Sequence, residues 1–383
     1  MTDPGRETLT LVLDQLVARV PGGIGRYTRE LARAVANTTP EGWQVDGLVS
    51  RTPPADAERI RRLVPGLREL HRLPLDRRLL ARAWAQGIPA GRIPAHVHSA
   101  SVLAPLTAHR RGTRPSVVAT VHDVVPWTHP ETLTARGARW HRRMGERAAR
   151  YADAIVVPTA AVASALAEIL GLGDRIRVIP GAVSAELGLP EDAGDRATRL
   201  ELPDAYVLAV GTLEPRKGLS SLIDAMARPG VPKVPLLIAG PTGWGGVDVA
   251  EFAARAGLGP GRVRALGSVS DADLAVLYQR ASVFVMPSLA EGFGLPVLEA
   301  FSHGTAVIHS DDPALTEVAG GAGRGVALAG DTPYSQRLAE ALIDVLGDPD
   351  GARRLATLGA RRARDFDWNA SATMVWALHR ELS

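Results

Sequence analysis

Cysteine is absent from the 383 residues of this sequence. Without a thiol the chain forms neither a disulfide framework nor a thiolate zinc site, and nothing points to an oxidising compartment. No apolar run approaches the roughly 20 residues that a membrane-spanning helix needs. The N-terminal segment also lacks the basic and then apolar pattern of a secretory signal. We therefore expect a cytoplasmic protein that neither spans a membrane nor is secreted.

Lysine is nearly absent too, occurring only at positions 217 and 233, so arginine carries most of the positive charge. This usage, with abundant Ala, Pro and Gly, indicates a bacterial genome of high GC content. The net charge of +3 is unevenly spread, because residues 1–180 hold 26 Arg against 16 Asp and Glu, a difference of +10. Nucleic acid, anionic lipid and phosphorylated substrates all fit such a basic half, and charge alone does not choose among them.

Short apolar runs rich in β-branched residues alternate with helical stretches, which predicts parallel sheets and an α/β fold. The length exceeds what one hydrophobic core usually supports, and the alternation pauses at residues 180–204, a segment rich in Gly, Pro and Asp. We expect two Rossmann-like domains, 1–183 and 184–365, with ligands bound in the cleft between them, outside the carboxyl ends of the strands. The expected strands are 8–13, 45–49, 117–121, 154–157, 206–210, 236–239, 283–286 and 305–308.

The segment EGFGLPVLEA, residues 291–300, is the most informative motif and follows an expected strand. Its glycines leave backbone amides unobstructed, and Pro296 suits the first turn of a helix whose positive end would face an anion. Glu291 and Glu299 add carboxylates, which accept hydrogen bonds from sugar hydroxyls. The alternative is an ordinary solvent-facing helix, which the glycines and the proline disfavour. We predict a phosphate cradle flanked by carboxylates.

The segment VGTLEPRKGL, residues 210–219, places two cations before an expected helix that begins near Gly218. Arg216 and Lys217 would add mobile charge to the helix dipole at the same point. A diphosphate leaving group needs such charge, because negative charge grows on it as the bond to a sugar breaks. A surface Arg–Lys pair is the alternative, and the rarity of lysine argues against it.

The segment PGGIGRY, residues 21–27, follows the first expected strand. Its three glycines permit close approach of the backbone to a ligand before a helix expected near Tyr27. A tight turn without a ligand explains the segment equally well, since the spacing G-x-G-x-x-G is missing.

The segment VHDVVP places His122 and Asp123 at the carboxyl end of another expected strand. The histidine is suited to bind a sugar or move a proton there, with Asp123 orienting it or binding the acceptor. A structural histidine is the alternative. His98, in HVHSAS, is expected to be structural rather than to line an acceptor pocket.

In this order the motifs resemble family 4 of the retaining glycosyltransferases, a large group that includes bacterial mannosyl-, glucosyl- and rhamnosyltransferases. The resemblance covers almost the whole chain and extends to GSVSDADLAVLYQRA and the closing DFDWNASA. It implies the GT-B fold: two Rossmann-like domains with parallel sheets facing a central cleft, and a C-terminal helix, 366–383, crossing back to the N-terminal domain. The first domain would bind the acceptor and the second the nucleotide sugar.

The resemblance also implies a role for each motif residue. His122, Glu291 and Asp123 would be catalytic, Glu299 would bind the nucleotide ribose, and residues 267–269 would border the base. The donor diphosphate would be held by the Gly23 amide, the side chains of Arg216 and Lys217, and the amides of Phe293, Gly294 and Leu295.

One departure is Thr212, because many family members carry arginine there. No DxD-type acidic pair stands where a metal-dependent transferase needs one, because Asp311 and Asp312 lie in a late loop. We therefore expect no metal and no cofactor. With no well-placed carboxylate nucleophile, we expect front-side displacement, and the family resemblance implies that the anomeric configuration is retained.

GDP-mannose is the preferred donor, while UDP-glucose, UDP-N-acetylglucosamine and dTDP-deoxysugars fit the same motifs. The acceptor would be a glycan, a lipid-linked compound or a small molecule in cell-envelope polysaccharide biosynthesis. Two alternatives share the fold: a nucleotide-sugar 2-epimerase and a non-catalytic sugar-nucleotide-binding partner.

Arginines cluster around leucines in two stretches of the first domain. We expect a peripheral anionic membrane surface, on the inner face of the cell membrane, as a partner, with simple solvated helices as the alternative. Nucleic acid is not expected, because the arginines lack interleaved aromatic residues. The stretches contain Arg59, Arg61, Arg62, Arg68, Arg72, Arg77, Arg78 and Arg82, then Arg139, His141, Arg142, Arg143 and Arg147.

Overall fold

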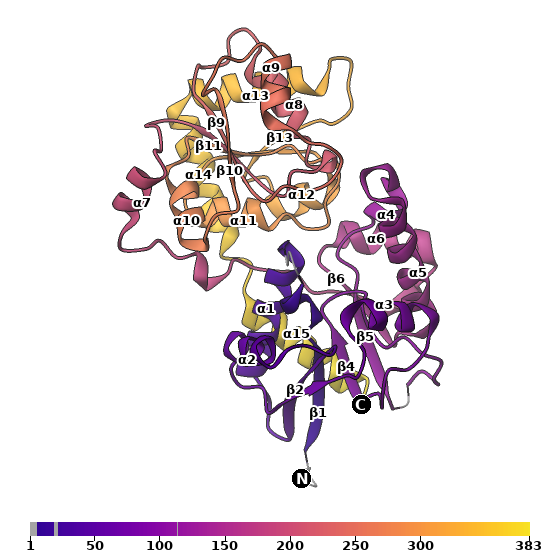
Figure 1. Ribbon diagram of the computed structural model, residues 1–383. Coiled ribbons are helices and arrows are strands. Elements are labelled where there is room, and N and C mark those ends of the chain that lie inside the picture. The colour runs from indigo at the N-terminus through magenta and orange to yellow at the C-terminus, as the bar shows by residue number, and fades with distance from the viewer. Residues whose placement is uncertain (1–5, 19–21, 113) are drawn as a thin grey trace. The chain divides into compact units, whose positions relative to one another are not determined.

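The computed structural model describes residues 6–18, 22–112 and 114–383 (Figure 1). These residues form two compact units, each with its own parallel sheet. Unit 1 runs to Gly181 and includes Asp367–Ser383, whereas unit 2 comprises Ala182–Phe366. The divisions at 181/182 and 366/367 lie beside the expected boundaries at 183/184 and 365/366.

Unit 1 contains a seven-stranded sheet of order β3-β2-β1-β4-β5-β6-β7, in which every described pairing is parallel. The order reverses between β1 and β4, so the carboxyl ends of these neighbours form a crevice of the kind that binds ligands in open α/β sheets. The strands are β1 (Glu7–Val12), β2 (Trp43–Val49), β3 (Glu69–Arg72), β4 (His96–Ser99), β5 (Ser116–Thr120), β6 (Ala154–Val157) and β7 (Ile176–Val178).

The helices of unit 1 are α1 (Gly22–Asn37), α2 (Pro54–Leu63), α3 (Arg77–Gln86), α4 (Val125–Thr128), α5 (Ala135–Tyr151), α6 (Ala160–Leu170) and α15 (Trp368–Glu381). The last of these packs on α1, where the Trp376 indole donates to the Val35 carbonyl at 3.2 Å. The Ser371 hydroxyl donates to the Pro180 carbonyl at 2.8 Å. The C-terminal helix therefore belongs to unit 1, as the family resemblance implied.

Unit 2 contains a six-stranded sheet of order β10-β9-β8-β11-β12-β13, again parallel at every described pairing. Its strands are β8 (Val207–Val210), β9 (Leu236–Ala239), β10 (Val263–Gly267), β11 (Val283–Met286), β12 (Val307–Ser310) and β13 (Arg324–Val326). Its helices are α7 (Ala193–Arg199), α8 (Leu219–Met226), α9 (Val249–Arg255), α10 (Asp271–Arg280), α11 (Leu295–Ser302), α12 (Pro313–Ala319), α13 (Tyr334–Gly347) and α14 (Pro349–Ala363).

The sheet of unit 2 is buried on both faces, since alternate residues of its strands enter two separate hydrophobic clusters. Val207 and Val285 pack in one cluster, and Leu208 and Phe284 pack in the other. A strand covered on both sides reads as a continuous apolar run, which is why these strands are visible in the sequence. The order reverses between β8 and β11, so their carboxyl ends meet at the crevice of this sheet.

The described part of the chain contains no helix long and apolar enough to cross a membrane.

Candidate active site

The loops after β8 and β11 lie against each other at the crevice of unit 2. A short 3-10 turn, Pro215–Lys217, follows β8, and the Leu289 amide donates to the Arg216 carbonyl at 2.8 Å. Gly218 then begins α8 with a φ of +64°, and a Cβ at this residue would lie 2.1 Å from the Pro287 carbonyl oxygen. Only glycine therefore allows the two loops to approach this closely.

This approach brings together Arg216 and Lys217 from one motif and Glu291 from another. The Lys217 ammonium donates to Glu291 Oε1 at 2.6 Å, and Arg216 Nη1 donates to Oε2 at 2.9 Å. Arg216 is also held by Glu214 at 2.8 Å and by the Ala290 carbonyl at 2.7 Å. The cluster is nearly buried, because the Glu291 side chain is 9% exposed and those of the two cations are about 15% exposed.

The two cations keep Glu291 ionised. Burial by itself would raise the pKa of this carboxyl, but the charges of Arg216 and Lys217 and the hydrogen bond from Lys217 outweigh it and lower the pKa to about 2. An ionised carboxylate is an acceptor only, so at neutral pH Glu291 is suited to bind hydroxyl donors and not to donate a proton.

Asp312 supports Glu291 from behind, and the sequence analysis did not assign it this role. Its Oδ2 accepts the backbone N–H of Glu291 at 3.2 Å. Its Oδ1 accepts the amides of Ala314 and Leu315 at 3.0 and 3.1 Å, which caps α12. Burial raises the pKa of Asp312. The one sequence signal is Asp-Pro at the start of a helix.

The amides of Phe293, Gly294 and Leu295 lie at the N-terminal end of α11, where amides lack intrahelical acceptors. Gly294 begins this helix with a φ of +91°, and a Cβ there would lie 2.4 Å from Leu315 Cδ2. The glycine therefore lets α11 start close to α12. The cradle predicted from EGFGLP has the backbone form expected for an anion site.

Glu299 lies in the middle of α11 and is only 2% exposed. Its Oε2 accepts the hydroxyl of Tyr278, on α10, at 2.9 Å. Tyr278 was not predicted from the sequence as a site residue, because a tyrosine among leucines is typical of a hydrophobic core.

His122 follows β5 in unit 1, and its Nε2 lies 2.7 Å from the Ala100 carbonyl. Because a carbonyl only accepts, Nε2 carries the hydrogen, and Nδ1 of the neutral ring is left as an acceptor. Burial lowers the pKa of His122, so the ring is neutral at pH 7. The ring is held by the hydrogen bond that it donates to the Ala100 carbonyl, while Asp123 accepts from the Val125 amide at 3.1 Å. Binding of the acceptor, the other role expected of Asp123, stays a prediction.

Tyr27 is a second residue that the sequence analysis undervalued. Its ring meets the His122 ring edge-on at 4.8 Å and the Trp368 ring at 5.4 Å, and its hydroxyl donates to the Ile179 carbonyl at 3.3 Å. The PGGIGRY motif therefore supports His122 through its last residue.

The glycines of this motif lie inside a helix and not, as expected, in the segment before it. Helix α1 begins at Gly22, five residues before the predicted start near Tyr27, so Gly22, Gly23 and Gly25 belong to its first turns. A Cβ at Gly23 would meet no atom within 4 Å, so packing does not demand glycine there. Pro21, the first residue of the motif, lies outside the described residues.

His98 lies inside strand β4 and not after a strand, and it is buried against α15. Its Nδ1 lies 3.2 Å from Nε2 of His379, which is also buried. The structural alternative for His98 is therefore the right one.

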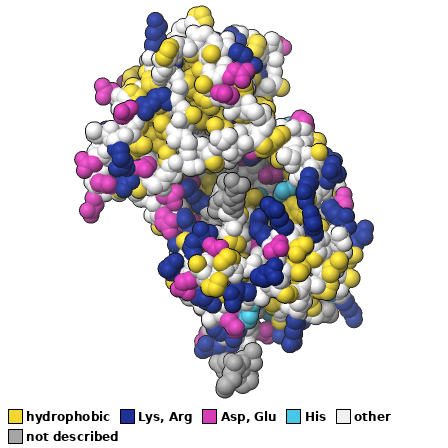
Figure 2. Space-filling view, viewed as in Figure 1, with side chains coloured by type: hydrophobic (Ala, Val, Ile, Leu, Met, Phe, Trp, Pro, Cys, Tyr) yellow, Lys and Arg dark blue, Asp and Glu magenta, His cyan; other side chains and the backbone are white. Residues whose placement is uncertain are grey.

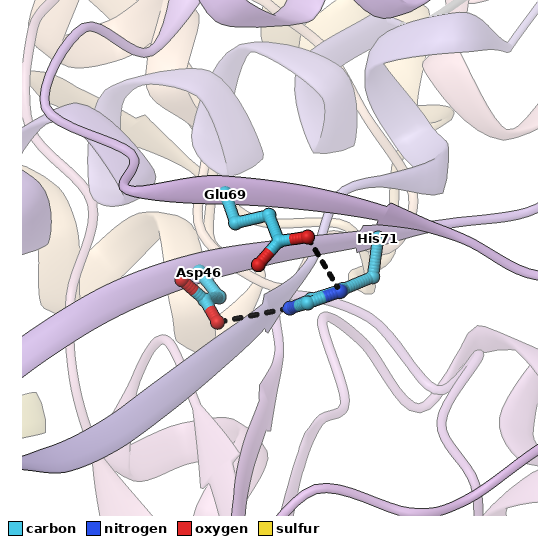
Figure 3. A group of neighbouring side chains, drawn as sticks. All are labelled: Asp46, Glu69 and His71. Atoms are coloured by element: carbon cyan, nitrogen blue, oxygen red, sulfur yellow. Dashed lines mark hydrogen bonds and ion pairs between the residues drawn. The ribbon is translucent and has the colours of Figure 1, made fainter. Parts of the chain in front are cut away.

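Within residues 6–18, 22–112 and 114–383, one group has the composition and spacing of a metal site: Asp46, Glu69 and His71, on β2 and β3 (Figure 3). His71 Nε2 lies 2.9 Å from Asp46 Oδ2 and its Nδ1 lies 3.7 Å from Glu69. Arg68 donates to both oxygens of Asp46, so a cation bound there would face a guanidinium. The arrangement fits a buried carboxylate neutralised by protein cations.

Two family profiles match the chain. The profile described as "Glycosyl transferases group 1" matches residues 192–362, and that described as "Glycosyltransferase Family 4" matches residues 21–187. O-antigen chain mannosyltransferase B of Escherichia coli is 32% identical over 270 residues, or 67% of this chain and 68% of that protein. The MMP alpha-(1->4)-mannosyltransferase of Mycolicibacterium hassiacum is 30% identical over 286 residues, and the match covers 69% of this chain but only 65% of that protein.

Two solved structures superpose on nearly the whole chain. Sucrose-phosphate synthase from Thermosynechococcus elongatus gives a TM-score of 0.74 at 25% identity and covers 98% of this chain and 99% of its own. The Anabaena protein HepE in complex with UDP and glucose also gives 0.74, at 19% identity, and covers 98% of this chain and all of its own. At 19% identity the similarity is one of fold.

Proposed function

The chain belongs to the group 1 glycosyltransferases, in family 4 and the GT-B fold class, and we propose that it transfers a hexose from a nucleoside diphosphate sugar with retention of configuration and without a metal ion. The observation that carries this proposal is the cluster of Arg216, Lys217 and Glu291 beside the start of α11. Two cations, the amides at the start of a helix and an ionised carboxylate suit a diphosphate joined to a sugar.

In this proposal the cations and the amides of α11 bind the diphosphate, while Glu291 accepts hydrogen bonds from the sugar hydroxyls. The ammonium of Lys217 carries three hydrogens and gives one to Glu291, so it is suited to bind both groups, and the charge of Arg216 lies beside it. The bond from the anomeric carbon to the diphosphate oxygen breaks as the bond from the acceptor oxygen forms on the same face. The acceptor proton passes to the departing phosphate oxygen.

Fixed positive charge takes the place of a metal ion in this scheme. Negative charge grows on the leaving diphosphate, and preorganised donors in a buried site stabilise it more than they do in water. His122 has an acceptor, Nδ1, that is suited to a sugar hydroxyl. Gly23 contributes a backbone amide, and Glu299 binds the ribose.

We propose mannose from GDP-mannose as the donor and a glycan, a lipid-linked compound or a small molecule of cell-envelope polysaccharide biosynthesis as the acceptor. The support is that the E. coli and Mycolicibacterium relatives are both named mannosyltransferases. The Anabaena protein, by contrast, holds UDP and glucose. The base and the sugar are therefore the first properties to measure.

The test is a donor screen by thermal shift and nucleotide release, with GDP-, UDP-, dTDP- and ADP-sugars and EDTA present. We expect the sugar nucleotides of one base to raise the melting temperature of the wild type. Slow hydrolysis of these compounds should release the nucleoside diphosphate. Glu291→Gln should still bind the free nucleotide but lose about a hundredfold in release, the usual effect of removing one stabilising group.

Glu251→Gln is the matched control, since Glu251 lies on α9 of the same unit, is 62% exposed and pairs only loosely with Arg255 at 3.9 Å. Stabilisation by no nucleotide sugar would refute the transferase proposal. Activity that appears only when a divalent cation is added would refute the metal-independent mechanism while leaving transfer in place.

We also propose that unit 1 meets an anionic membrane surface. Arg61, Arg62, Arg78 and Arg82 are exposed on α2 and α3, and Leu79 and Ile88 are exposed beside them at 44% and 51%. Figure 2 shows Lys and Arg side chains gathered over this unit among hydrophobic ones. The second basic stretch supports the proposal less, because Arg142, Arg143 and Arg147 donate to the carbonyls of Pro126, Ala85 and Leu106.

A further inference from the structure

The hydroxyl of Tyr278 holds one oxygen of the Glu299 carboxylate. Glu299 lies on α11 and is 2% exposed, and the hydroxyl of Tyr278 donates to its Oε2 at 2.9 Å. Buried in this way, the bond fixes the position of Oε2 and with it the plane of the carboxyl group.

Tyr278 is itself held in place on every side. Its side chain is fully buried on α10, its ring meets Phe284 edge-on at 5.4 Å, and it stacks on His303 at 5.9 Å with 10° between the planes. The Thr305 hydroxyl donates to its backbone carbonyl at 2.6 Å. The phenol oxygen therefore has a position that only movement of the core would change.

From this geometry we propose that Tyr278 is a positioning residue for the nucleotide ribose. By holding Oε2, it presents the Glu299 carboxylate to the 2′- and 3′-hydroxyls and so gives the enzyme its preference for ribonucleotides. This inference rests on the proposed function, in which Glu299 binds the ribose. The packing of the core does not require the hydroxyl, since phenylalanine fills nearly the same volume.

The chain offers a matched control in Tyr206. Tyr206 is also fully buried, packs in the same hydrophobic cluster, and donates its hydroxyl to the Leu277 carbonyl at 2.8 Å, one residue before Tyr278. Tyr206→Phe therefore removes a buried tyrosine hydroxyl from the same core without touching Glu299.

The test measures the affinities of GDP and 2′,3′-dideoxy-GDP for the wild type, Tyr278→Phe and Tyr206→Phe, with the uridine pair used if the wild type binds uridine. We expect the wild type to prefer the ribonucleotide by roughly ten- to hundredfold, the range for hydrogen bonds to a charged group. Tyr278→Phe should lose most of this preference by weakening the ribonucleotide alone. Tyr206→Phe should keep the preference.

If Tyr278→Phe weakens both nucleotides equally, the tyrosine is merely structural and the inference is wrong. If the wild type binds both nucleotides equally, the ribose role of Glu299 is wrong and the inference falls with it, while the transferase proposal stands. Binding of neither nucleotide refutes the proposed function itself. Should Tyr278→Phe fail to fold, Glu299→Asp withdraws the carboxylate from an intact Tyr278 and should remove the same preference; retention of it would overturn the inference.

Discussion

At the scale of single residues, the site depends on side chains that hold other side chains. Glu291 contacts Arg216 and Lys217 through its carboxylate, and Asp312 fixes its backbone. Asp312→Asn replaces one carboxylate oxygen by an NH2 group, which donates and does not accept hydrogen bonds. The asparagine therefore cannot accept from both the Glu291 N–H and the amides at the start of α12. Asn caps helices well, so the disturbance should fall on Glu291.

We therefore expect Asp312→Asn to lower turnover of the sugar nucleotide about tenfold, while the affinity for the free nucleoside diphosphate changes less than about twofold. The reason is that Glu291 binds the sugar and not the diphosphate in the proposed function. Steady-state kinetics and nucleotide titration measure the two effects. Asp348→Asn is the control, because Asp348 also caps a helix, α14, through the Gly351 amide at 2.9 Å, but its side chain is 55% exposed. Equal losses of both properties would contradict the prediction.

At the scale of elements, α15 is attached to the sheet of unit 1 by histidines. His379 lies 3.2 Å from His98 and its ring is 6.3 Å from that of His96. Burial lowers the pKa of His98 to about 4, and burial and the neighbouring histidines lower that of His379 well below its usual value. Both rings are therefore neutral when α15 is docked.

This arrangement predicts that unit 1 loses stability in mild acid. The unfolded chain binds protons near pH 6.5 and the folded chain only near pH 4, so the stabilisation is complete above pH 6.5 and is lost as the pH falls toward 4. From pH 7 to pH 5, His98 alone should lower the free energy of unfolding by about 2 kcal/mol. Urea denaturation followed by tryptophan fluorescence reports on this unit, because six of the seven tryptophans, all but Trp244, lie in it.

The double variant His98→Leu/His379→Leu should remain folded at pH 7, since it removes both hydrogen-bond partners together. Its stability should fall less between pH 7 and pH 5 than that of the wild type, while His96 and His122, whose pKa values burial also lowers, still contribute. His129→Gln, on an exposed loop of the same unit, should behave as the wild type does. An unchanged pH dependence in the double variant would mean that other groups cause it.

At the scale of the whole molecule, charge is divided along the chain: +10 in residues 1–180 and, by difference from the net charge of +3, −7 in the rest. We expect the protein to sediment with anionic vesicles at low salt, not with neutral vesicles, and to be released by about 0.5 M salt, where exposed charges are screened.

Each arginine near an anionic surface contributes about 1 kcal/mol, so Arg78→Glu/Arg82→Glu should weaken vesicle binding by more than tenfold. Arg353→Glu/Arg354→Glu, on the exposed face of α14 in unit 2, is the control and should bind normally. Equal binding to neutral vesicles, or none to anionic vesicles at low salt, would refute the membrane proposal.

The central strands and the motif loops follow from local sequence. Residues 154–157, 236–239 and 283–286 were predicted as strands and are β6, β9 and β11, because a strand buried on both faces is a short apolar run. The edge strands β3, β7, β10 and β13 escaped prediction, since exposed positions interrupt their apolar pattern. The central strand β4 escaped it for another reason: its sequence HVHS contains two buried histidines.

The sequence by itself determined the alternation of strands and helices, the family and the residues predicted to bind an anion, because these depend on neighbours a few positions apart. Tertiary structure alone decided which groups hold those residues. Tyr278 lies 21 positions from Glu299, Asp312 lies 21 from Glu291, and His98 lies 281 from His379. No local periodicity records such pairs, since each exists only because the fold packs separate strands, loops and helices against one another.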